Sequence, residues 1–553
     1  MSTASISVGK PAPASPLPFP ADLSHSPLLG ILGVLLGATI VTIAGRLLSL
    51  GLADLKGNVG IGSDAATWIN TAFNTALMFI GPFSVYLGGL LGPRRVLLLC
   101  APLFTLVCAF LPLVHSYSFL IFLVVIGGLT SGTFYPLTLA FALRNIPLRY
   151  LALLLALYIT CIEGAVNFTP SLYGVLREHI SWKWMFWFPA IVTPVMIGCI
   201  YFGIPQSPKP RSKKKPPSFA GFCYLSAGCA LLYAALDQGQ RLDWWHSGLF
   251  TAMFAGALFF LVCALLQRFR RPNFLIDLPY LRNWNTVLLA FGLFMFRFVL
   301  LGTVVIIPLS LSVRGLDAEQ YGSAVFWTAV FELTLALIGA LLLYRGTNSH
   351  LLMAIGFTAI AFACLINSDF TSAWGPENYF RSELLMAVGQ SFAMLGLVSA
   401  LILQAAFSGG LEAPQRALTL SAFIHTVRLL GGQAGAVWMG HFIADREKLH
   451  SNLLGLRVQS GNWLTDSTLH GLAAGLAGKS SGALAATGRA LGLVSGKLRL
   501  QAYCLTFIDA FHLVAWACVV MLFVTAVLRR SPLNFRQLPS LQRGSISPQE
   551  NRP

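Results

Sequence analysis

The run LLGILGVLLGATIVTIAGRLLSLGL, residues 28–52, places this chain in a membrane. It contains a single charged side chain, Arg46, and a helix needs about 20 mostly apolar residues to cross a bilayer. We expect this first span to act as an uncleaved signal anchor. Residues 1–27 before it are rich in Pro, Ser and Ala, and we expect them to form a disordered cytoplasmic tail.

Runs of the same kind recur through the rest of the 553 residues. Hydrophobic residues make up 56% of the chain and charged residues 10%, whereas an average soluble domain is roughly 25% charged. This composition excludes a soluble globule, a disordered chain, collagen and a disulfide-rich scaffold, and the apolar runs are too continuous for a β-barrel. The sequence therefore predicts an all-α polytopic membrane protein. Fourteen spans are predicted, at residues 28–52, 66–90, 95–114, 118–142, 148–175, 184–204, 218–236, 246–267, 284–312, 321–344, 350–367, 380–407, 417–443 and 502–528.

The excess of positive charge predicts how the spans are oriented. The 37 Lys and Arg against 20 Asp and Glu give a formal charge of +17. Basic residues gather in alternate short loops, as at Arg94 and Arg95 and in the segment 209–215, which is typical of cytoplasmic loops. We therefore expect a multi-pass protein of the inner (plasma) membrane with both termini in the cytoplasm. The exception is the segment 444–500, which is predicted to lie outside although it carries seven basic residues.

Several classes of function are excluded by the residues that the sequence lacks. The ten cysteines all lie in apolar runs without metal-ligand spacing, so we expect packing residues and no metal site. The sequence has no GxxxxGK[ST] phosphate loop, and no Ser/His/Asp, HExxH or paired-carboxylate arrangement is placed for catalysis. We therefore expect no enzyme activity and no catalytic residues. We also expect no cofactor and no nucleic-acid partner.

Five short segments, in matching order and spacing, resemble one transporter family. They are LGATIVTIA at 36–44, LGGLLGPRRV at 87–96, SWKWMF at 181–186, DQGQRLDWW at 237–245 and RLLGGQAG at 428–435. Together they resemble the major facilitator superfamily, and more narrowly its fourteen-span drug:proton antiporters of the EmrB/QacA type. The resemblance covers roughly residues 28–530.

This resemblance implies a domain organisation. Two six-helix bundles are expected at 28–204 and 284–530, the second with an outer loop at 444–500. Between them, 205–283 would hold a basic loop and two inserted spans, and 531–553 would form a second cytoplasmic tail. The residues that match gating and packing motifs of the family are Gly88, Gly92, Arg94, Arg95, Pro170, Gly431, Gly432 and Gly435.

The chain departs from the family pattern at positions tied to coupling or gating. Gly37 and Gly89 stand where the first-span and loop motifs carry Asp, and Val124 stands where a span-four motif carries Arg. The fold does not depend on these charges. Proton coupling, however, would have to use other residues.

Six ionisable side chains inside the predicted spans are the candidates for substrate binding and proton coupling. A charge within a span is costly unless it is paired or hydrated, so such residues are usually functional. They are Arg46, Glu163, Arg297, Glu332, His425 and Arg428.

Two of these candidates lie in the predicted amino-terminal bundle. Arg46 is either an anion-binding group in a central cavity or a residue near the outer end of its span that reaches the interface. Glu163 is either a protonatable carboxylate that carries the coupling proton or a structural partner for an arginine such as Arg46.

The other four lie in the predicted carboxyl-terminal bundle. Arg297 should face the bundle interior, and Glu332 is its expected counter-charge, in a pair that is either functional or purely structural. His425 and Arg428 are three residues apart and so share a helix face. A histidine there suits a proton relay, with a packing role as the alternative.

These features predict a secondary active transporter that exports amphipathic, drug-like or organic-acid compounds by alternating access, coupled to proton influx and able to confer multidrug resistance. The arginines favour anionic substrates. The alternatives are an uptake or facilitative transporter of a small organic anion and a non-transporting membrane receptor. The resemblance also implies that 444–500 docks a periplasmic membrane-fusion adaptor, leading to an outer-membrane channel, with a plain connector as the alternative.

Overall fold

The computed structural model describes residues 27–145, 150–204, 218–270, 283–407, 414–459, 461–479, 482–529 and 535. Within these ranges the chain forms helices and no strand, which confirms the predicted all-α class. Nearly all of the two expected tails, 1–27 and 531–553, and most of the expected basic loop after residue 204 lie outside the described residues.

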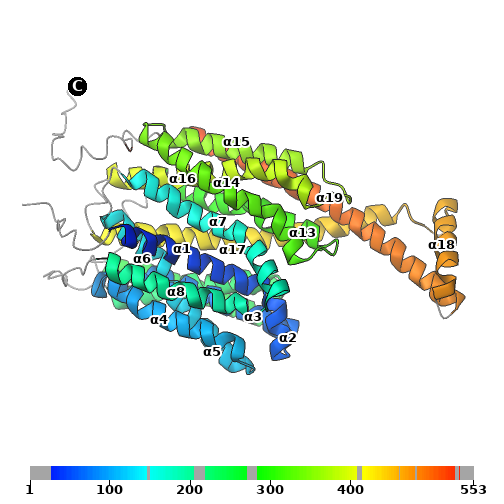
Figure 1. The fold of residues 1–553 in the computed structure, drawn as a ribbon, viewed down its shortest axis with the longest axis horizontal. Helices are drawn as coiled ribbons and strands as arrows, with labels where there is room; N and C mark the ends of the chain where they lie inside the picture. The colour runs from blue at the N-terminus through cyan, green and yellow to red at the C-terminus, as the bar shows by residue number, and fades with distance from the viewer. Residues whose placement is uncertain are drawn as a thin grey trace, which may run out of the picture.

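Most of the helices run side by side along one axis, as Figure 1 shows. The first half of the chain forms α1 (Pro27–Leu50), α2 (Leu52–Val59), α3 (Ser63–Leu91), α4 (Pro93–Phe110), α5 (Tyr117–Ser131), α6 (Phe134–Asn145), α7 (Leu151–His179), α8 (Trp184–Gly203), α9 (Phe219–Gly239) and α10 (Gly248–Arg270). The second half forms α12 (Trp284–Val299), the π-helical turn η4 (Gly302–Ile306), α13 (Ile307–Ser312), α14 (Ala318–Tyr344), α15 (Ser349–Asn367), α16 (Phe380–Phe407), α17 (Pro414–Gly455), α18 (Trp463–Leu476) and α19 (Ala483–Val527). Short 3₁₀ turns lie at η1 (Leu111–Leu113), η3 (Trp244–His246), η5 (Pro376–Tyr379) and η6 (Ala477–Lys479).

Thirteen helical segments among the described residues are long and apolar enough to cross a membrane, and they coincide with thirteen of the fourteen predicted spans. The remaining prediction, 417–443, lies within α17 and falls short on composition. Its polar residues His425, Arg428 and Gln433 line an internal cavity, so the helix is less apolar than its neighbours. Because α17 packs against α3, α6, α9, α12 and α19, it nevertheless runs through the interior of the bundle.

The helix contacts fall into two groups joined along two seams. In the first half α1 packs on α6, α7 and α8, and α4 packs on α5 and α8. In the second half α15 packs on α16 and α19, and α12 packs on α16 and α17. The two groups meet where α7 lies along α14 and where α3 lies along α17. Helices α9 and α10 pack on each other, and α9 also packs on both α3 and α17.

The glycines of the 428–435 motif let α17 approach α12 closely. A Cβ atom at Gly431 would lie 3.0 Å from the Cα of Phe294, and one at Gly435 would lie 3.3 Å from the Cα of Phe298. The sequence predicted this use of small residues, which bring helix backbones together inside a membrane. The close approach holds Arg297, on α12, against the same stretch of α17.

The segment 444–500 forms a helical arm. Helix α17 continues to Gly455 and α19 begins at Ala483, so both extend well beyond the rest of the bundle, with α18 lying across their far end (Figure 1). At the base of the arm Asp509 lies 3.2 Å from Nε of Arg446 and 2.9 Å from Nε2 of His450. The expected outer loop is therefore mostly helix, and it extends both of its flanking spans.

Candidate functional site

A cavity of about 500 Å³ lies at the centre of the bundle. Its walls come from α1, α3, α7, α9, α12 and α17, so both halves of the chain contribute. The lining residues lie in the C-terminal halves of α1 and α9 and the N-terminal half of α3, which places the cavity toward the α2 end of the bundle. Its ionisable and amide side chains are Arg46, Asn70, Asn74, Asp237, Gln240, Arg297, His425, Arg428 and Gln433.

Glu163 forms the centre of the charge arrangement behind this wall. Its Oε2 lies 3.3 Å from Nη1 of Arg297, and its Oε1 lies 4.0 Å from Nη1 of Arg428. Glu163 is 1% exposed, while both arginines also line the cavity. The carboxylate of α7 is thus shared by guanidinium groups of α12 and α17, across the interface between the two halves of the bundle.

This geometry corrects two pairings expected from the sequence. Arg297 pairs with Glu163 and not with Glu332, and Glu163 pairs with Arg297 and Arg428 and not with Arg46. Residues 163 and 297 come from different bundles, and no local pattern indicates which helix faces meet. Arg428 is also held by Tyr135, whose ring centroid lies 4.4 Å from the guanidinium carbon.

Arg46 lines the cavity without a carboxylate partner among the described residues. Its Nη2 donates a hydrogen bond to the carbonyl oxygen of Val304, 3.1 Å away. Its buried Nε has no hydrogen-bond partner in the described part of the chain. Of the two roles expected for Arg46, the geometry fits the cavity-lining one.

Glu332 lies deeper, away from the cavity, in a network of uncharged groups. It is 1% exposed, and its Oε1 accepts a hydrogen bond from Nδ2 of Asn167 at 3.1 Å. The same amide nitrogen donates to Oε1 of Gln390 at 2.9 Å, and Gln390 in turn donates to Thr303 at 2.7 Å. Asn167 of α7 thereby bridges α14 and α16, so this network also crosses the interface between the halves.

A third buried carboxylate, Glu383, was not among the sequence candidates. It is fully buried and accepts a hydrogen bond from Thr328, one helical turn before Glu332 on α14. The sequence places it only three residues into the predicted span 380–407, where an acidic residue usually lies at the interface. Its burial follows from the packing of α16 against α14 and α15, which nothing in the local pattern indicates.

His425 lies against the cavity wall, 1% exposed and stacked on Tyr135 with ring centroids 4.9 Å apart. Neither ring nitrogen has a hydrogen-bond partner among the described residues. A satisfied packing histidine would have one. The ring therefore differs from a packing histidine with satisfied nitrogens, and the proton-relay role of His425 stays a prediction.

Four of the eight motif residues, Gly88, Gly92, Arg94 and Arg95, lie at the opposite end of the bundle. A Cβ atom at Gly88 would lie 2.8 Å from Leu137 and 3.2 Å from Leu418, so α3, α6 and α17 are closely packed there. Gly92 joins α3 to α4 with φ of +85°, a conformation that favours glycine. Arg94 is buried and its Nη2 donates to the carbonyl oxygen of Tyr201 at 2.7 Å. Close packing at this end separates the cavity from the side where α1 begins and α19 ends.

The other gating candidates lie in different surroundings. Arg95 is exposed. Pro170 lies inside α7, and the backbone next to it touches α14, since a Cβ at Gly322 would lie 2.7 Å from the nitrogen of Ser171. Gly432 faces Arg297, whose Nε would lie 3.4 Å from a Cβ at that position.

Asp237 is a cavity residue that the sequence reasoning did not select. It lies near the end of α9, in the segment DQGQRLDWW, and accepts hydrogen bonds from Thr71 of α3 and Gln433 of α17. The one sequence feature that could have identified Asp237 is its position in the motif DQGQRLDWW. The inserted helix α9 forms part of the cavity wall.

The arrangement can bind an organic anion at the cavity arginines. The anion would then take the place of the Glu163 carboxylate, which can be neutralised by a proton. Three guanidinium groups face one cavity, and guanidinium forks suit carboxylates. No group of three or more His, Cys, Asp or Glu side chains that could hold a metal ion occurs in the described ranges.

Comparison with known proteins identifies a family and several relatives of this chain. A sequence model of the Major Facilitator Superfamily matches residues 34–436. The chain is 24% identical to the Multidrug export protein EmrB of Haemophilus influenzae, over 82% of this chain and 87% of that protein. It is 23% identical to the Fatty acid resistance protein FarB of Neisseria gonorrhoeae, over 81% and 85%, and 22% identical to the Colistin resistance protein EmrB of Acinetobacter baumannii, over 87% and 92%.

Solved structures share the fold. The human organic anion transporter MFSD10 (TETRAN) superposes with a TM-score of 0.51 at 14% identity, covering 90% of this chain and all of that one. The proton:xylose symporter XylE superposes with a TM-score of 0.51 at 13% identity, covering 93% and 98%. At these identities the likeness to solved structures concerns the fold alone. The family match over residues 34–436, together with the EmrB relatives, confirms the resemblance seen in the sequence motifs.

Proposed function

The chain belongs to the major facilitator superfamily, and on that premise we propose that it exports amphipathic, drug-like or organic-acid compounds as a proton-coupled secondary transporter. Relatives named for multidrug export and fatty acid resistance support this activity. We place it in the inner membrane with both termini in the cytoplasm, because basic residues such as Arg94 and Arg95 gather in alternate loops.

The shared carboxylate of Glu163 is the observation that carries this proposal. While Glu163 is ionised it occupies Arg297 and approaches Arg428. When it takes up a proton from the cavity, its charge is lost and both guanidinium groups can accept a substrate anion instead. Substrate anion and Glu163 carboxylate thus compete for the same two arginines, so protonation of Glu163 favours substrate binding and loss of that proton favours substrate release.

The two halves of the bundle would rock about this site. We propose the domain division 28–204 and 284–530, with α9 and α10 inserted between them, because the charge pairs cross the seam between these parts. Closing the α2 end and opening the opposite end would require α3 and α17 to separate near Gly88 and Leu418, where they now pack closely.

Reconstituted transport tests the proposal. Purified protein in liposomes should accumulate a carboxylated fluorescent compound when a pH gradient is imposed, and should lose the accumulation when an ionophore collapses that gradient. Equal flux with and without the gradient would instead indicate facilitated diffusion. Binding without any flux would indicate a receptor.

The helical arm gives a reason to propose a partner. Large apolar side chains remain exposed on it, including Trp463 at 80% and Leu484 at 91%. We propose that the arm docks a periplasmic membrane-fusion adaptor, leading to an outer-membrane channel. A photo-crosslinking residue at position 463, used in intact cells, should capture an adaptor of this type. Capture by lipid alone would contradict the docking.

A further inference from the structure

The inserted helix α9 supplies an acidic group to the cavity through Asp237. No other Asp or Glu side chain lines the cavity among the described residues. Glu163 lies behind the wall and is engaged by two arginines. The cavity therefore has one carboxylate that the proposed proton coupling does not use.

Asp237 is held in place by three helices. Thr71 of α3 donates to its Oδ2, and Nε2 of Gln433 on α17 donates to its Oδ1 at 2.7 Å. The hydroxyl of Tyr233, one turn earlier on α9, donates to Oε1 of Gln433 at 2.9 Å. The carboxylate is therefore fixed at the point where the inserted helix touches both halves of the bundle.

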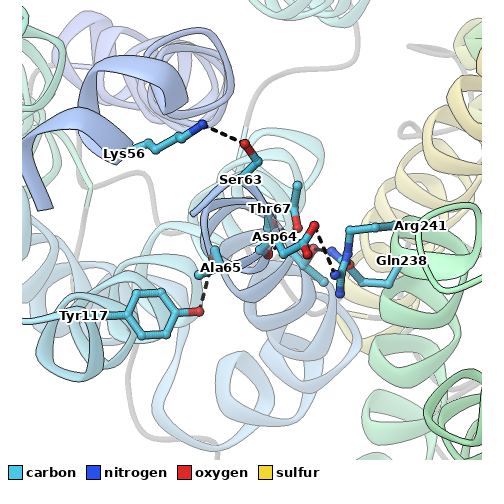
Figure 2. Close-up of polar contacts among 9 residues, drawn as sticks. Lys56, Ser63, Asp64, Ala65, Thr67, Tyr117, Gln238 and Arg241 are labelled. Carbon is cyan, nitrogen blue, oxygen red and sulfur yellow. Dashed lines mark hydrogen bonds and ion pairs between the residues drawn. The ribbon is translucent and has the colours of Figure 1, made fainter. Parts of the chain in front are cut away.

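A second group of contacts fixes the end of α9, as Figure 2 shows. Nε of Arg241 donates to Oε1 of Gln238 at 2.5 Å, and Nη1 of Arg241 lies 3.7 Å from Asp64 at the start of α3. The guanidinium group also lies 5.5 Å from the ring centroid of Trp68. These contacts, made by Arg241 from the turn that follows α9, hold the end of the helix and with it Asp237 close to α3.

The charge of Asp237 is not neutralised by its partners. Both donors to its oxygens are uncharged, and no Lys, Arg or His lies within 4.0 Å of it in the described part of the chain. A carboxylate can accept about four hydrogen bonds, so it retains capacity for a further donor. A charge left in this state beside a cavity is available to a cationic group of a ligand.

The positive and negative sides of the cavity meet on α17. Arg297 faces Gly432, and Asp237 accepts from the next residue, Gln433. A cavity of about 500 Å³ is within the usual range for a single drug-sized molecule, roughly 300–1,000 Å³. One compound could therefore contact the arginines and Asp237 at once.

We propose that Asp237 is a specificity-determining residue that binds the protonated amine of zwitterionic substrates, while the arginines bind their carboxylate. This inference rests on the proposed export function and narrows its substrate class to amphoteric organic acids. Cationic compounds without a carboxylate would face three guanidinium groups and bind poorly.

A matched pair of ligands tests this role. One is a fluoroquinolone with a protonated piperazine ring, and the other is its analogue with a neutral morpholine ring. Their dissociation constants are measured on the full-length protein in nanodiscs, for wild type, Asp237→Asn and Asp237→Glu. Asp243→Asn, at an exposed residue in the same loop region with a side chain 83% exposed, is the matched control.

The wild type and the control should bind the piperazine compound about tenfold more tightly than its analogue, as expected for one charged hydrogen bond in a partly hydrated site. Asp237→Asn should reduce this ratio to about one with little change for the morpholine compound, and Asp237→Glu should restore part of it. An unchanged ratio in Asp237→Asn, an equal loss for both ligands, or failure of the wild type to bind the piperazine compound overturns the inference. Selective binding without proton-driven flux would overturn export and leave the role of Asp237 supported.

Discussion

Replacing Glu163 by Gln separates substrate binding from proton coupling. The substitution keeps the size of the side chain and removes its charge. At the 3.3 Å separation from Arg297, and with an effective dielectric constant of about 20, the attraction lost is about 5 kcal/mol. Desolvation of the charges offsets part of it, and since Arg297 borders a cavity we expect a net destabilisation of about 3 kcal/mol.

The same change should improve binding of anionic ligands. With no carboxylate competing for Arg297 and Arg428, a carboxylated ligand should bind Glu163→Gln about tenfold more tightly than the wild type. The wild type keeps the competing carboxylate, so the ratio of the two affinities measures the competition. Accumulation driven by a pH gradient should be lost, while exchange of labelled for unlabelled substrate should continue.

Titration of a carboxylated ligand into protein in nanodiscs measures the change in affinity, and liposomes under an imposed pH gradient measure accumulation and exchange. Glu178→Gln is the matched control, because Glu178 lies on the same helix with a side chain 45% exposed. If Glu163→Gln bound the anion with wild-type affinity, the competition mechanism would be wrong. A variant that binds anions more tightly yet still accumulates them under a gradient would move the coupling proton to another group.

Three further predictions concern other parts of the site. Glu332→Gln should reduce proton-driven accumulation several-fold but change anion affinity less than about twofold, because Glu332 contacts no arginine among the described residues; a tenfold affinity change in a binding titration would contradict this. Arg46→Ala should weaken binding of carboxylated ligands about tenfold and leave neutral ligands of the same size unaffected, which a paired titration measures. Gly431→Leu should lower stability by about 1–3 kcal/mol, because its side chain would meet the backbone of Phe294; thermal unfolding should show no comparable loss for Gly198→Leu, where nothing lies within 4 Å.

Much of the fold could be predicted because its strongest determinants are local. An apolar run of about 20 residues forms a spanning helix whatever its neighbours are, since unpaired backbone groups cannot be left in lipid. Thirteen of the predicted spans are found for this reason. The exception, 417–443, shows the converse, because α17 has polar residues where other spans have apolar ones, and these line the cavity.

The candidate site was predictable only as a set of residues. Charges within spans marked Arg46, Glu163, Arg297, Glu332, His425 and Arg428, and five of the six lie at the cavity or in direct contact with a side chain that lines it. The partners of these charges were not predictable. The pairing of Glu163 with Arg297 joins positions 134 residues apart on different helices.

Asp237 illustrates the same limit. Its motif was visible in the sequence, but its place in the cavity depends on α9 packing between α3 and α17. Glu383 lies near the start of its predicted span, where carboxylates usually reach water, so the local pattern does not single it out.

The sequence by itself determined the membrane class, the number and position of most spans, the family and the charges that deserve testing. These follow from composition and short-range pattern, because each span satisfies its own backbone hydrogen bonds. Only the tertiary structure decided that Glu163 is shared between two arginines, that Arg46 faces the cavity without a carboxylate, and that an inserted helix contributes Asp237. Such pairings depend on which helix faces meet, and helix–helix packing inside a membrane is set by shape and by small residues that lie far apart in the chain.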